Sequence, residues 1–211
     1  MITFAIIGVT CLVSFLCFNN EESFNKLAHI PTLIDRNGEY YRLLTSGFVH
    51  ANPPHLFLNM FVLFNFGPLL EDIFTTEAMF GDFGGTGYLL FYLSAIVAAN
   101  APTFVKNRDN FSYIGIGASG AIAALLFACI VFIPMLPLRV FFMIPIKAWL
   151  FGVLYLLYET YADKNVSDGV AHDVHLSGAF YGILFIAVYN FESVINFIKV
   201  VQMSVLTGDF F

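Results

Sequence analysis

The chain contains 211 residues, of which 59% are hydrophobic, 18% aromatic and only 11% charged. Soluble domains carry about 25% charged residues, so this composition argues against a cytosolic globular protein and for a protein of the lipid bilayer. The formal net charge is -6 and the sequence has no basic run. Nucleic-acid binding is therefore excluded as a main function, because little positive charge is available to neutralise phosphates.

Six segments come close to the roughly 20 mostly apolar residues that a helix needs to span a bilayer. They are residues 2–18, 55–74, 86–105, 114–136, 140–162 and 175–195. Residues 19–54 form a long mixed loop with aromatic and leucine side chains, which is expected to lie in the membrane interface. We therefore predict an all-α membrane protein: a single domain over residues 1–211, with six transmembrane helices and an interfacial first loop.

If all six segments cross the bilayer, the second, fourth and sixth begin on the same side. His55 and Asn59 lie at the start of the second segment. Ser119 lies five residues after the predicted start of the fourth segment, and His175 begins the sixth. Polar residues inside a bilayer are costly and usually mark function, so we predict that these four residues share one site.

Ser119 stands in the run Gly117-Ala118-Ser119-Gly120-Ala121. A serine becomes a nucleophile only when its hydroxyl is accessible and a base can take its proton, and small neighbours leave room for a peptide backbone. The alternative interpretation is a stripe of small residues that lets membrane helices pack closely. The catalytic interpretation therefore needs a base opposite the serine.

His175 is the candidate base. Gly178 and Gly182 follow it and stand four residues apart on one helical face, a pattern that lets two membrane helices approach backbone to backbone. Packing of this face against the glycine-rich start of the fourth segment would bring the imidazole within hydrogen-bonding reach of Ser119. A single histidine at such a position is more often structural, but its pairing with a small-residue serine motif favours catalysis.

His55 and Asn59 are spaced i to i+4, so both side chains share one helical face. Acyl transfer develops an oxyanion, and fixed hydrogen-bond donors aimed at that oxygen stabilise the transition state. The two side chains, together with the backbone N–H of Ser119, are suitable donors. The alternative is that Asn59 joins helices by hydrogen bonds while His55 extends toward the interface.

Further residues extend this set of motifs along the chain. The full set is Tyr41-Arg42, His50, His55-x-x-x-Asn59, Glu71, Gly117-Ala118-Ser119-Gly120 and Ala171-His172-x-x-His175-x-x-Gly178-x-x-x-Gly182. In this order and on these helices, the set resembles the rhomboid family of intramembrane serine proteases. The resemblance covers about residues 40–185.

The resemblance implies a six-helix core with a Ser–His dyad rather than a triad, in which Ser119 is the nucleophile and His175 the general base and then acid. His55 and Asn59 would line the oxyanion hole. The substrates would be transmembrane proteins in the lipid bilayer, hydrolysed in or near a transmembrane segment, and the fifth helix and the loop after it would form the entry. No metal and no organic cofactor is implied.

The resemblance also implies structural roles. Arg42 would hold the first loop, and Glu71 would hold the inner end of the second helix. Ala123 is a departure, because some family members have at this position an aromatic residue that stacks on the catalytic histidine. Four glycines are expected to serve close packing, namely Gly117, Gly120, Gly178 and Gly182.

Three other polar residues near the predicted site have simpler interpretations. Asp173 stands two residues before His175, so the two side chains point to different faces of a helix and a triad through Asp173 is disfavoured. His172 and His175 are spaced i to i+3, but no carboxylate or thiolate is expected at the same depth to complete a metal site. His50 is expected to anchor the first loop through hydrogen bonds.

Two arguments about orientation disagree. The predicted catalytic side carries six cationic residues and the opposite side three, so the positive-inside rule places the catalytic end in the cytoplasm. These residues are Lys26, Arg36, Arg42, Lys106, Arg108 and Lys164 on the first side, and Arg139, Lys147 and Lys199 on the second. The resemblance implies the reverse, and three of the six cations lie in the long first loop. We therefore expect a multi-pass protein of the bacterial inner membrane whose active site opens to the extracytoplasmic side.

Two other functions compete with proteolysis. A catalytically inactive relative would bind transmembrane proteins without cutting them, but such proteins typically lose the serine or the histidine. A small transporter or channel would use Asn59, Ser119 and His175 as a polar pathway. Against it, the sequence shows no inverted repeat, and we expect no carboxylate buried in mid-membrane to couple ions.

Overall fold

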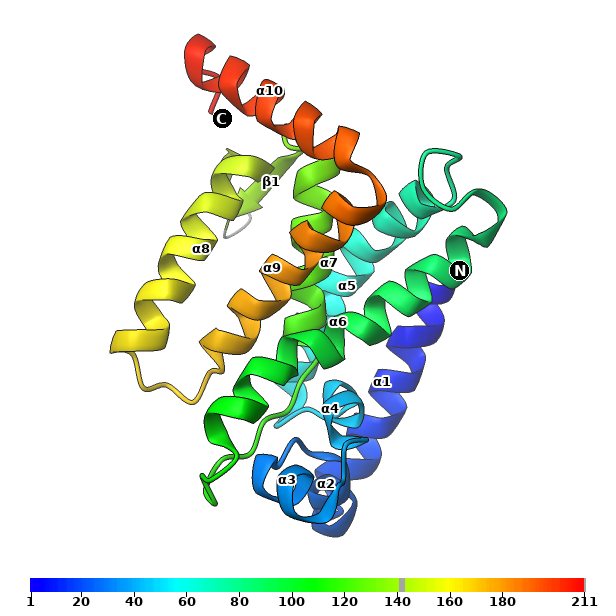
Figure 1. The fold of residues 1–211 in the computed structure, drawn as a ribbon, viewed down its shortest axis with the longest axis vertical. Coiled ribbons are helices and arrows are strands. Elements are labelled where there is room, and N and C mark those ends of the chain that lie inside the picture. The colour runs from blue at the N-terminus through cyan, green and yellow to red at the C-terminus, as the bar shows by residue number, and fades with distance from the viewer. Residues whose placement is uncertain (141–142, 211) are drawn as a thin grey trace.

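The computed structural model describes residues 1–140 and 143–210 as a bundle of helices (Figure 1). The long helices are α1 (Ile2–Phe18), α5 (Pro53–Phe74), α6 (Gly84–Asn107), α7 (Ser119–Phe132), α8 (Ala148–Asn165), α9 (His172–Tyr189) and α10 (Phe191–Thr207). The short elements are α2 (Glu21–Leu27), α3 (Pro31–Asn37), α4 (Arg42–Thr45), the 3-10 helices η1 (Ser46–Phe48) and η2 (Gly81–Phe83), and the strands β1 (Pro137–Val140) and β2 (Ile144–Lys147).

α7 forms the centre of the bundle. Its residues 120–131 are all buried, and it carries no charged side chain. It packs most closely against α9 and also contacts α5 and α6 (Figure 1). Small residues let membrane helices approach one another closely, and α7 carries Gly120, Ala121, Ala123 and Ala124, which explains why neighbouring helices pack tightly against it.

The first loop is a folded cap of short helices at one end of the bundle (Figure 1). Buried Arg42 holds it together: Nη1 donates to the carbonyl oxygens of Asn25 and Ala28 at 2.5 and 2.9 Å, and Nε donates to Glu39 Oε2 at 2.6 Å. Hydrogen bonds from a charged donor are stronger than neutral ones. A guanidinium with several donors therefore joins α2 to α4.

Glu71 lies at the opposite end of the bundle, near the end of α5. Its carboxylate accepts the backbone N–H groups of Ile2 and Thr3 at 2.6 and 3.0 Å, and the Thr3 hydroxyl at 2.8 Å. The first N–H groups of a helix have no intrahelical acceptor and carry partial positive charge. Glu71 therefore caps α1 and joins it to α5.

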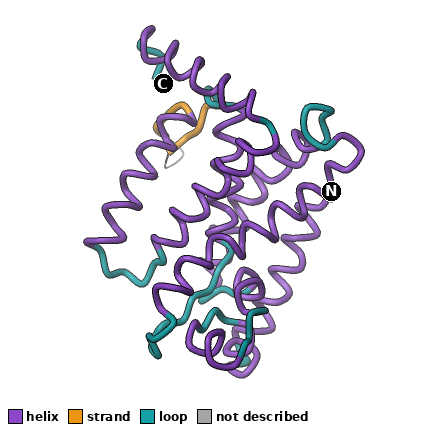
Figure 2. The backbone as a smooth tube through the Cα atoms, in the orientation of Figure 1, coloured by secondary structure: helices purple, strands orange, loops and turns teal. Residues whose placement is uncertain are grey.

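The first three predicted segments coincide with α1, α5 and α6 to within two residues, whereas the predicted start of the fifth helix is wrong. β1 and β2 form an antiparallel hairpin with Pro137 opposite Lys147, and α8 begins only at Ala148. Pro145 disfavours a helix here, because proline lacks the backbone N–H and clashes with the preceding turn. Figure 2 shows this hairpin, in orange, close to the end of α10, where the Lys147 N–H donates to the Phe210 carbonyl. Residues 141–142 of the predicted helix lie outside the described residues.

The sixth predicted segment, residues 175–195, is two helices rather than one. α9 begins at His172 and ends at Tyr189, and α10 continues after a bend of 116°. The bend occurs at Asn190, whose side chain accepts the N–H of Ser193 and caps α10. α10 consequently lies across the end of the bundle opposite α2 and α3 (Figure 1).

The described helices give a mostly helical, membrane-type structure. Among the described helices, two stretches are long and apolar enough to cross a bilayer, namely α5 and residues Gly81–Asn107. α9 and α10 reach the required length and apolar character only when they are counted together as one bent pair. α1 and α7 are apolar but contain 17 and 14 residues. At 1.5 Å per residue, α7 spans about 21 Å, less than the roughly 30 Å of a bilayer core. The number of six crossings therefore stays a prediction.

Candidate active site

Ser119 is the first residue of α7. The predicted start of this helix at residue 114 is wrong, because the chain before Ser119 is held in a non-helical connection. Gly115 pairs with His29 in an isolated bridge, and the Gly117 N–H donates to the Ser46 carbonyl at 3.0 Å. Gly117 has a φ of 112°, a conformation open to glycine and strained for other residues. The predicted end at residue 136 also differs, since α7 stops at Phe132, two residues before a proline.

The Ser119 hydroxyl contacts an imidazole. Ser119 Oγ lies 2.8 Å from His175 Nε2, which is a hydrogen-bonding distance. His175 lies in the first turn of α9, and Ser119 opens α7. The two side chains meet because both helices begin at the same end of the bundle.

Glycines at the α7–α9 contact make this distance possible. A Cβ atom on Gly178 would overlap the Gly120 carbonyl oxygen, and one on Gly182 would overlap the Ala124 carbonyl oxygen. A Cβ on Gly120 would lie 2.6 Å from the Ala99 Cβ. Any larger residue at these positions would separate the helices, so the predicted backbone-to-backbone packing is present.

A cavity of about 810 Å³ opens beside the serine and the histidine. His55, Asn59, Ser119 and His175 all line it, so the four predicted site residues come together. Residues 112–116 and the connection 168–171 between α8 and α9 complete its wall. Its size is within the range of ligand sites, about 300–1,000 Å³.

Several hydrogen-bond donors lie at the cavity that contains Ser119. The Asn59 side-chain amide donates to the His55 carbonyl oxygen at 3.0 Å, so in this state it is bonded within α5. Ser119 and Gly120 occupy the first two positions of α7, where backbone N–H groups have no intrahelical acceptor. The positive end of the α7 dipole lies at the same place as these free N–H groups. Both features can stabilise negative charge next to Ser119.

His50 supports the wall of the cavity. Its Nδ1 lies 2.9 Å from Ser14 Oγ, and its Nε2 accepts the Ala118 N–H at 3.4 Å. Its ring is fully buried and lies 5.0 Å, centroid to centroid, from the His55 ring. Burial lowers the pKa of His50 to about 3, and His55 adds to this effect. A neutral His50 therefore joins α1, the first loop and the residue before the serine.

Glu159 of α8 is a site residue that the sequence analysis missed. It is 4% exposed. Its Oε1 lies 3.0 Å from His175 Nδ1 and its Oε2 lies 2.5 Å from His172 Nδ1. The expectation that no carboxylate lies at the depth of these histidines is therefore wrong. An acidic residue inside a predicted membrane helix was the available signal.

The cluster of Glu159, His172 and His175 consists of residue types that bind metal ions. Glu159, His172 and His175 each offer one ligand atom, and these atoms lie within 4.8 Å of one another. Zinc holds such ligands at about 2.0–2.1 Å, which separates tetrahedral ligand atoms by about 3.4 Å. The observed separations of 2.5 and 3.0 Å are shorter, so the cluster fits hydrogen bonds better than metal ligation.

Asp173 points away from His175. Its Oδ2 lies 3.2 Å from Lys106 Nζ, and Asp163 Oδ1 lies 3.5 Å from the same nitrogen. Asp173 therefore joins α9 to α6, in agreement with the sequence argument against a triad through it.

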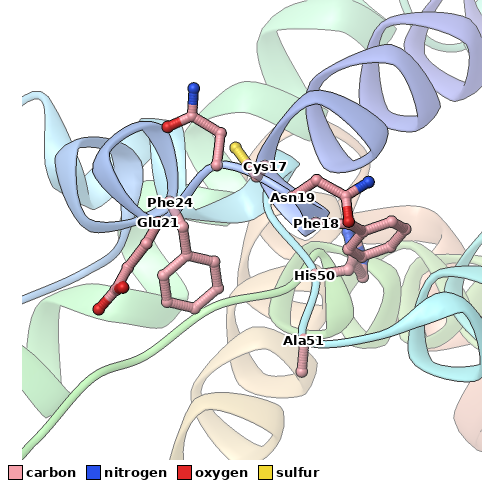
Figure 3. A pocket seen from close by; sticks show the side chains of 8 residues that line it. Cys17, Phe18, Asn19, Glu21, Phe24, His50 and Ala51 are labelled. Carbon is pink, nitrogen blue, oxygen red and sulfur yellow. The ribbon is translucent and has the colours of Figure 1, made fainter.

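A second pocket of about 390 Å³ lies beside His50, where α1 ends and α2 begins (Figure 3). Its lining contains neither Ser119 nor His175: it consists of Cys17, Phe18, Asn19, Asn20, Glu21, Phe24, His50 and Ala51. We therefore assign the candidate active site to the larger cavity.

Comparison with known proteins extends the motif evidence. A family model described as "Rhomboid domain" matches residues 37–190. "RHOMBOID-like protein 12, mitochondrial" of Arabidopsis thaliana is 30% identical over 152 residues, which cover 68% of this chain and 45% of that protein. "Putative rhomboid protease YdcA" of Bacillus subtilis (strain 168) is 35% identical over 89 residues, 42% of this chain and 39% of that protein. "Rhomboid-like protein 11, chloroplastic" of Arabidopsis thaliana is 30% identical over 163 residues, 70% of this chain and 51% of that protein. The chain spans about half or less of the length of these relatives.

Proposed function

We propose that this chain, which belongs to the rhomboid family, is a serine protease that hydrolyses peptide bonds in or near the transmembrane segments of membrane proteins. The observation that carries the proposal is the 2.8 Å contact between Ser119 Oγ and His175 Nε2. This contact lies at a cavity large enough for a stretch of peptide. Similarity to a relative named as a rhomboid protease supports it further.

The proposed reaction uses the serine as nucleophile and the histidine as base. Ser119 Oγ attacks the carbonyl carbon of the substrate peptide while His175 Nε2 takes the hydroxyl proton. His175 then gives this proton to the leaving amine as the C–N bond breaks, which leaves an acyl-enzyme. A water molecule, deprotonated by His175, attacks the acyl carbon and releases Ser119.

The oxyanion of each tetrahedral intermediate would lie near the start of α7. The N–H groups of Ser119 and Gly120 point out of the helix terminus, and preorganised donors of this kind stabilise developing negative charge. His55 and Asn59 lie on the same cavity wall. Asn59 would contribute once its amide leaves the His55 carbonyl and turns toward the substrate.

Substrate entry is proposed beside α8 and the connection 166–171. α8 contacts the bundle mainly through α9, and its outer face exposes apolar side chains such as Leu154 and Leu157. Val170 and Ala171 of the connection line the cavity. A movement of this connection would therefore open the cavity toward the lipid without disturbing the α7–α9 contact or the bonds from Glu159 of α8 to α9.

The membrane arrangement is part of the proposal. Six crossings would place Ser119 below the membrane surface, because α7 is short and begins at the serine. We propose a bacterial cell membrane as the location, with the cavity opening to the extracytoplasmic side. Two of the similar proteins carry the names of plant organelles.

The proposal is tested by cleavage of a transmembrane model substrate with purified protein in detergent, together with labelling by a fluorophosphonate probe. Wild type should cleave and be labelled, and Ser119→Ala should lose both activities while it elutes and unfolds like wild type. Ser94→Ala is the matched control, since Ser94 lies on α6 and bonds Tyr181 and its own helix; it should retain both activities.

The result that would overturn the proposal is undiminished cleavage by Ser119→Ala. Stable binding of the substrate by wild type without cleavage or labelling would favour an inactive client-binding protein. Proton-coupled flux in liposomes without proteolysis would favour a transporter.

A further inference from the structure

We infer that Glu159 is a positioning residue of this site: it holds His175 in the one tautomer and orientation that can accept the Ser119 proton. The inference rests on the proposed function of Ser119 and His175. It replaces the expected dyad with a chain of three side chains from three helices, Glu159 of α8, His175 of α9 and Ser119 of α7.

The imidazole of His175 has a partner at each of its two nitrogens. His175 Nδ1 lies 3.0 Å from Glu159 Oε1, and His175 Nε2 lies 2.8 Å from Ser119 Oγ. A neutral imidazole has one N–H donor and one bare nitrogen, and an ionised carboxylate can only accept hydrogen bonds. The proton of the neutral ring must then be on Nδ1. Nε2 is left bare toward the hydroxyl, as a general base requires.

The carboxylate of Glu159 is itself held in place by hydrogen bonds. Its other oxygen, Oε2, accepts a hydrogen bond from His172 Nδ1 at 2.5 Å, and both side chains are about 95% buried. Each carboxylate oxygen is thus bound by a different histidine of α9. Because a buried charge is stable only when it is hydrogen-bonded, the two contacts fix Glu159 and leave its carboxylate little freedom to rotate.

Glu159 also stabilises the charge that His175 gains during the reaction. When Ser119 attacks a peptide, its proton passes to His175 Nε2, the Nδ1 proton stays in place and the ring becomes a cation. The ionised Glu159, at 3.0 Å from Nδ1, stabilises that cation. When the leaving amine takes the Nε2 proton, the ring returns to its neutral form. Glu159 remains ionised throughout and forms no bond to substrate.

Other charged and titratable groups near His175 are separately accounted for. His55 of α5 faces it across the cavity, and His172 is bound to Glu159. Asp173 pairs with Lys106 of α6, and Asp168 lies 3.4 Å from His172 Nε2. In the described part of the chain, Glu159 is the carboxylate in contact with the His175 ring.

A purely structural role is the alternative, in which Glu159 only joins α8 to α9. The two roles differ in what they predict for kinetics and for the imidazole proton. Loss of an orienting carboxylate should lower kcat with little change in KM and should free the His175 ring to take the other tautomer. Loosening of a helix contact would instead reduce stability and leave the His175 tautomer unchanged.

The experiment compares Glu159→Gln, Glu159→Asp and the control Asp163→Asn in the full-length protein, with Ser119→Ala as the inactive reference. Asp163 is the matched control because it is the next carboxylate along α8 and pairs with Lys106 outside the cavity. For each protein, kcat, KM, the pH profile and the rate of fluorophosphonate labelling are measured, with and without EDTA.

We expect Glu159→Gln to lower kcat and the labelling rate by about 100-fold or more with a small change in KM, since loss of the orienting carboxylate leaves the wrong tautomer. Glu159→Asp keeps the charge, so it should recover part of kcat and a pH profile close to wild type. Asp163→Asn should match wild type, and EDTA should have no effect on any variant.

Three outcomes would overturn the inference while leaving the Ser119–His175 proposal intact. They are wild-type kcat in Glu159→Gln, a lowered kcat with no recovery in Glu159→Asp, and loss of activity on chelation that zinc restores. In contrast, a wild-type protein that neither cleaves nor is labelled would refute the proposed function itself.

A measurement that does not substitute Glu159 covers the case in which Glu159→Gln does not fold. In wild-type protein labelled with ¹⁵N-histidine, NMR reports which ring nitrogen of neutral His175 carries the proton, and His175→Asn identifies the signal. The inference requires the proton on Nδ1. A proton on Nε2 would overturn it.

Discussion

The absence of a Cβ atom on Gly178 controls how closely α9 approaches α7. The nearest atom to that missing Cβ is the Gly120 carbonyl oxygen, one residue after the serine. Gly178 is also one turn after His175, so the same contact sets the approach of the imidazole to the hydroxyl. The contact between Ser119 and His175 therefore depends on a residue that has no side chain and does not line the cavity.

Gly178→Ala should separate the two helices and weaken both fold and activity. Inserting a methyl group into a packed interior typically costs about 1–3 kcal/mol, and we expect a loss of stability in this range with a clear drop in cleavage and fluorophosphonate labelling. Unfolding in detergent and labelling rates measure the two effects. Gly8→Ala of α1 is the control, because nothing lies within 4 Å of its Cβ; it should be neutral or slightly stabilising. Unchanged labelling in Gly178→Ala would contradict this account.

At the scale of elements, the short helices of the first loop hold the non-helical chain that leads to the serine. His29 pairs with Gly115 through backbone hydrogen bonds in both directions, each 2.9 Å long. His50 binds Ser14 and the Ala118 N–H. Both rings are fully buried, and burial lowers the pKa of His29 to about 4 and that of His50 to about 3.

These two histidines predict a loss of stability in mild acid. Below about pH 6.5 the unfolded chain binds protons at both rings while the folded protein does not, so stability falls as pH decreases from 6.5 toward 4. Each group contributes about 1.4 kcal/mol per pH unit in the lower part of that window. Unfolding in detergent between pH 7.5 and 4.5 should show this slope, and His50→Gln should flatten it. A slope that His50→Gln does not change would show that His50 is not the cause.

The elements also show where periodicity succeeds. α1, α5 and α6 are long apolar runs, and hydrophobicity alone predicts them. β1 and β2 lie in a stretch that is also largely apolar, but they form a hairpin because prolines disfavour a helix there and the strands bond to each other and to the end of the chain. The bend at Asn190 was not predicted, because hydrophobicity does not report it. It depends on the Asn190 side chain, which accepts the N–H of Ser193 and caps the start of α10.

At the scale of the whole molecule, the cavity and the hairpin lie at opposite ends of α7. Asn110 is exposed in the connection before α7, and Met143 is exposed in the hairpin after it. If α7 crosses the membrane, the two positions face opposite compartments. Their accessibility therefore tests both the crossing and the orientation, on which the charge count and the family resemblance disagree.

In a variant without native cysteines, Asn110→Cys should react with a membrane-impermeant thiol reagent in intact cells. Met143→Cys should react only after the membrane is opened, because the cavity is proposed to face the extracytoplasmic side. The reverse pattern would support the positive-inside argument. Equal labelling of both positions in intact cells would show that α7 does not separate two compartments.

The sequence by itself determined the membrane class, three helices almost to the residue, and the residues Ser119, His175, His55 and Asn59 of the site. Composition and the spacing of polar residues in apolar runs carry this information, because a bilayer makes each such residue costly.

Only the tertiary structure placed Glu159 beside His175, started α7 at Ser119 and turned α10 across the end of the bundle. The Glu159 contact joins side chains from different helices, 16 positions apart. The other two features depend on hydrogen bonds that the flanking segments make. Periodicity within one helix does not indicate which face of α8 contacts α9. The contact between Glu159 and His175 is therefore seen only in the packed structure.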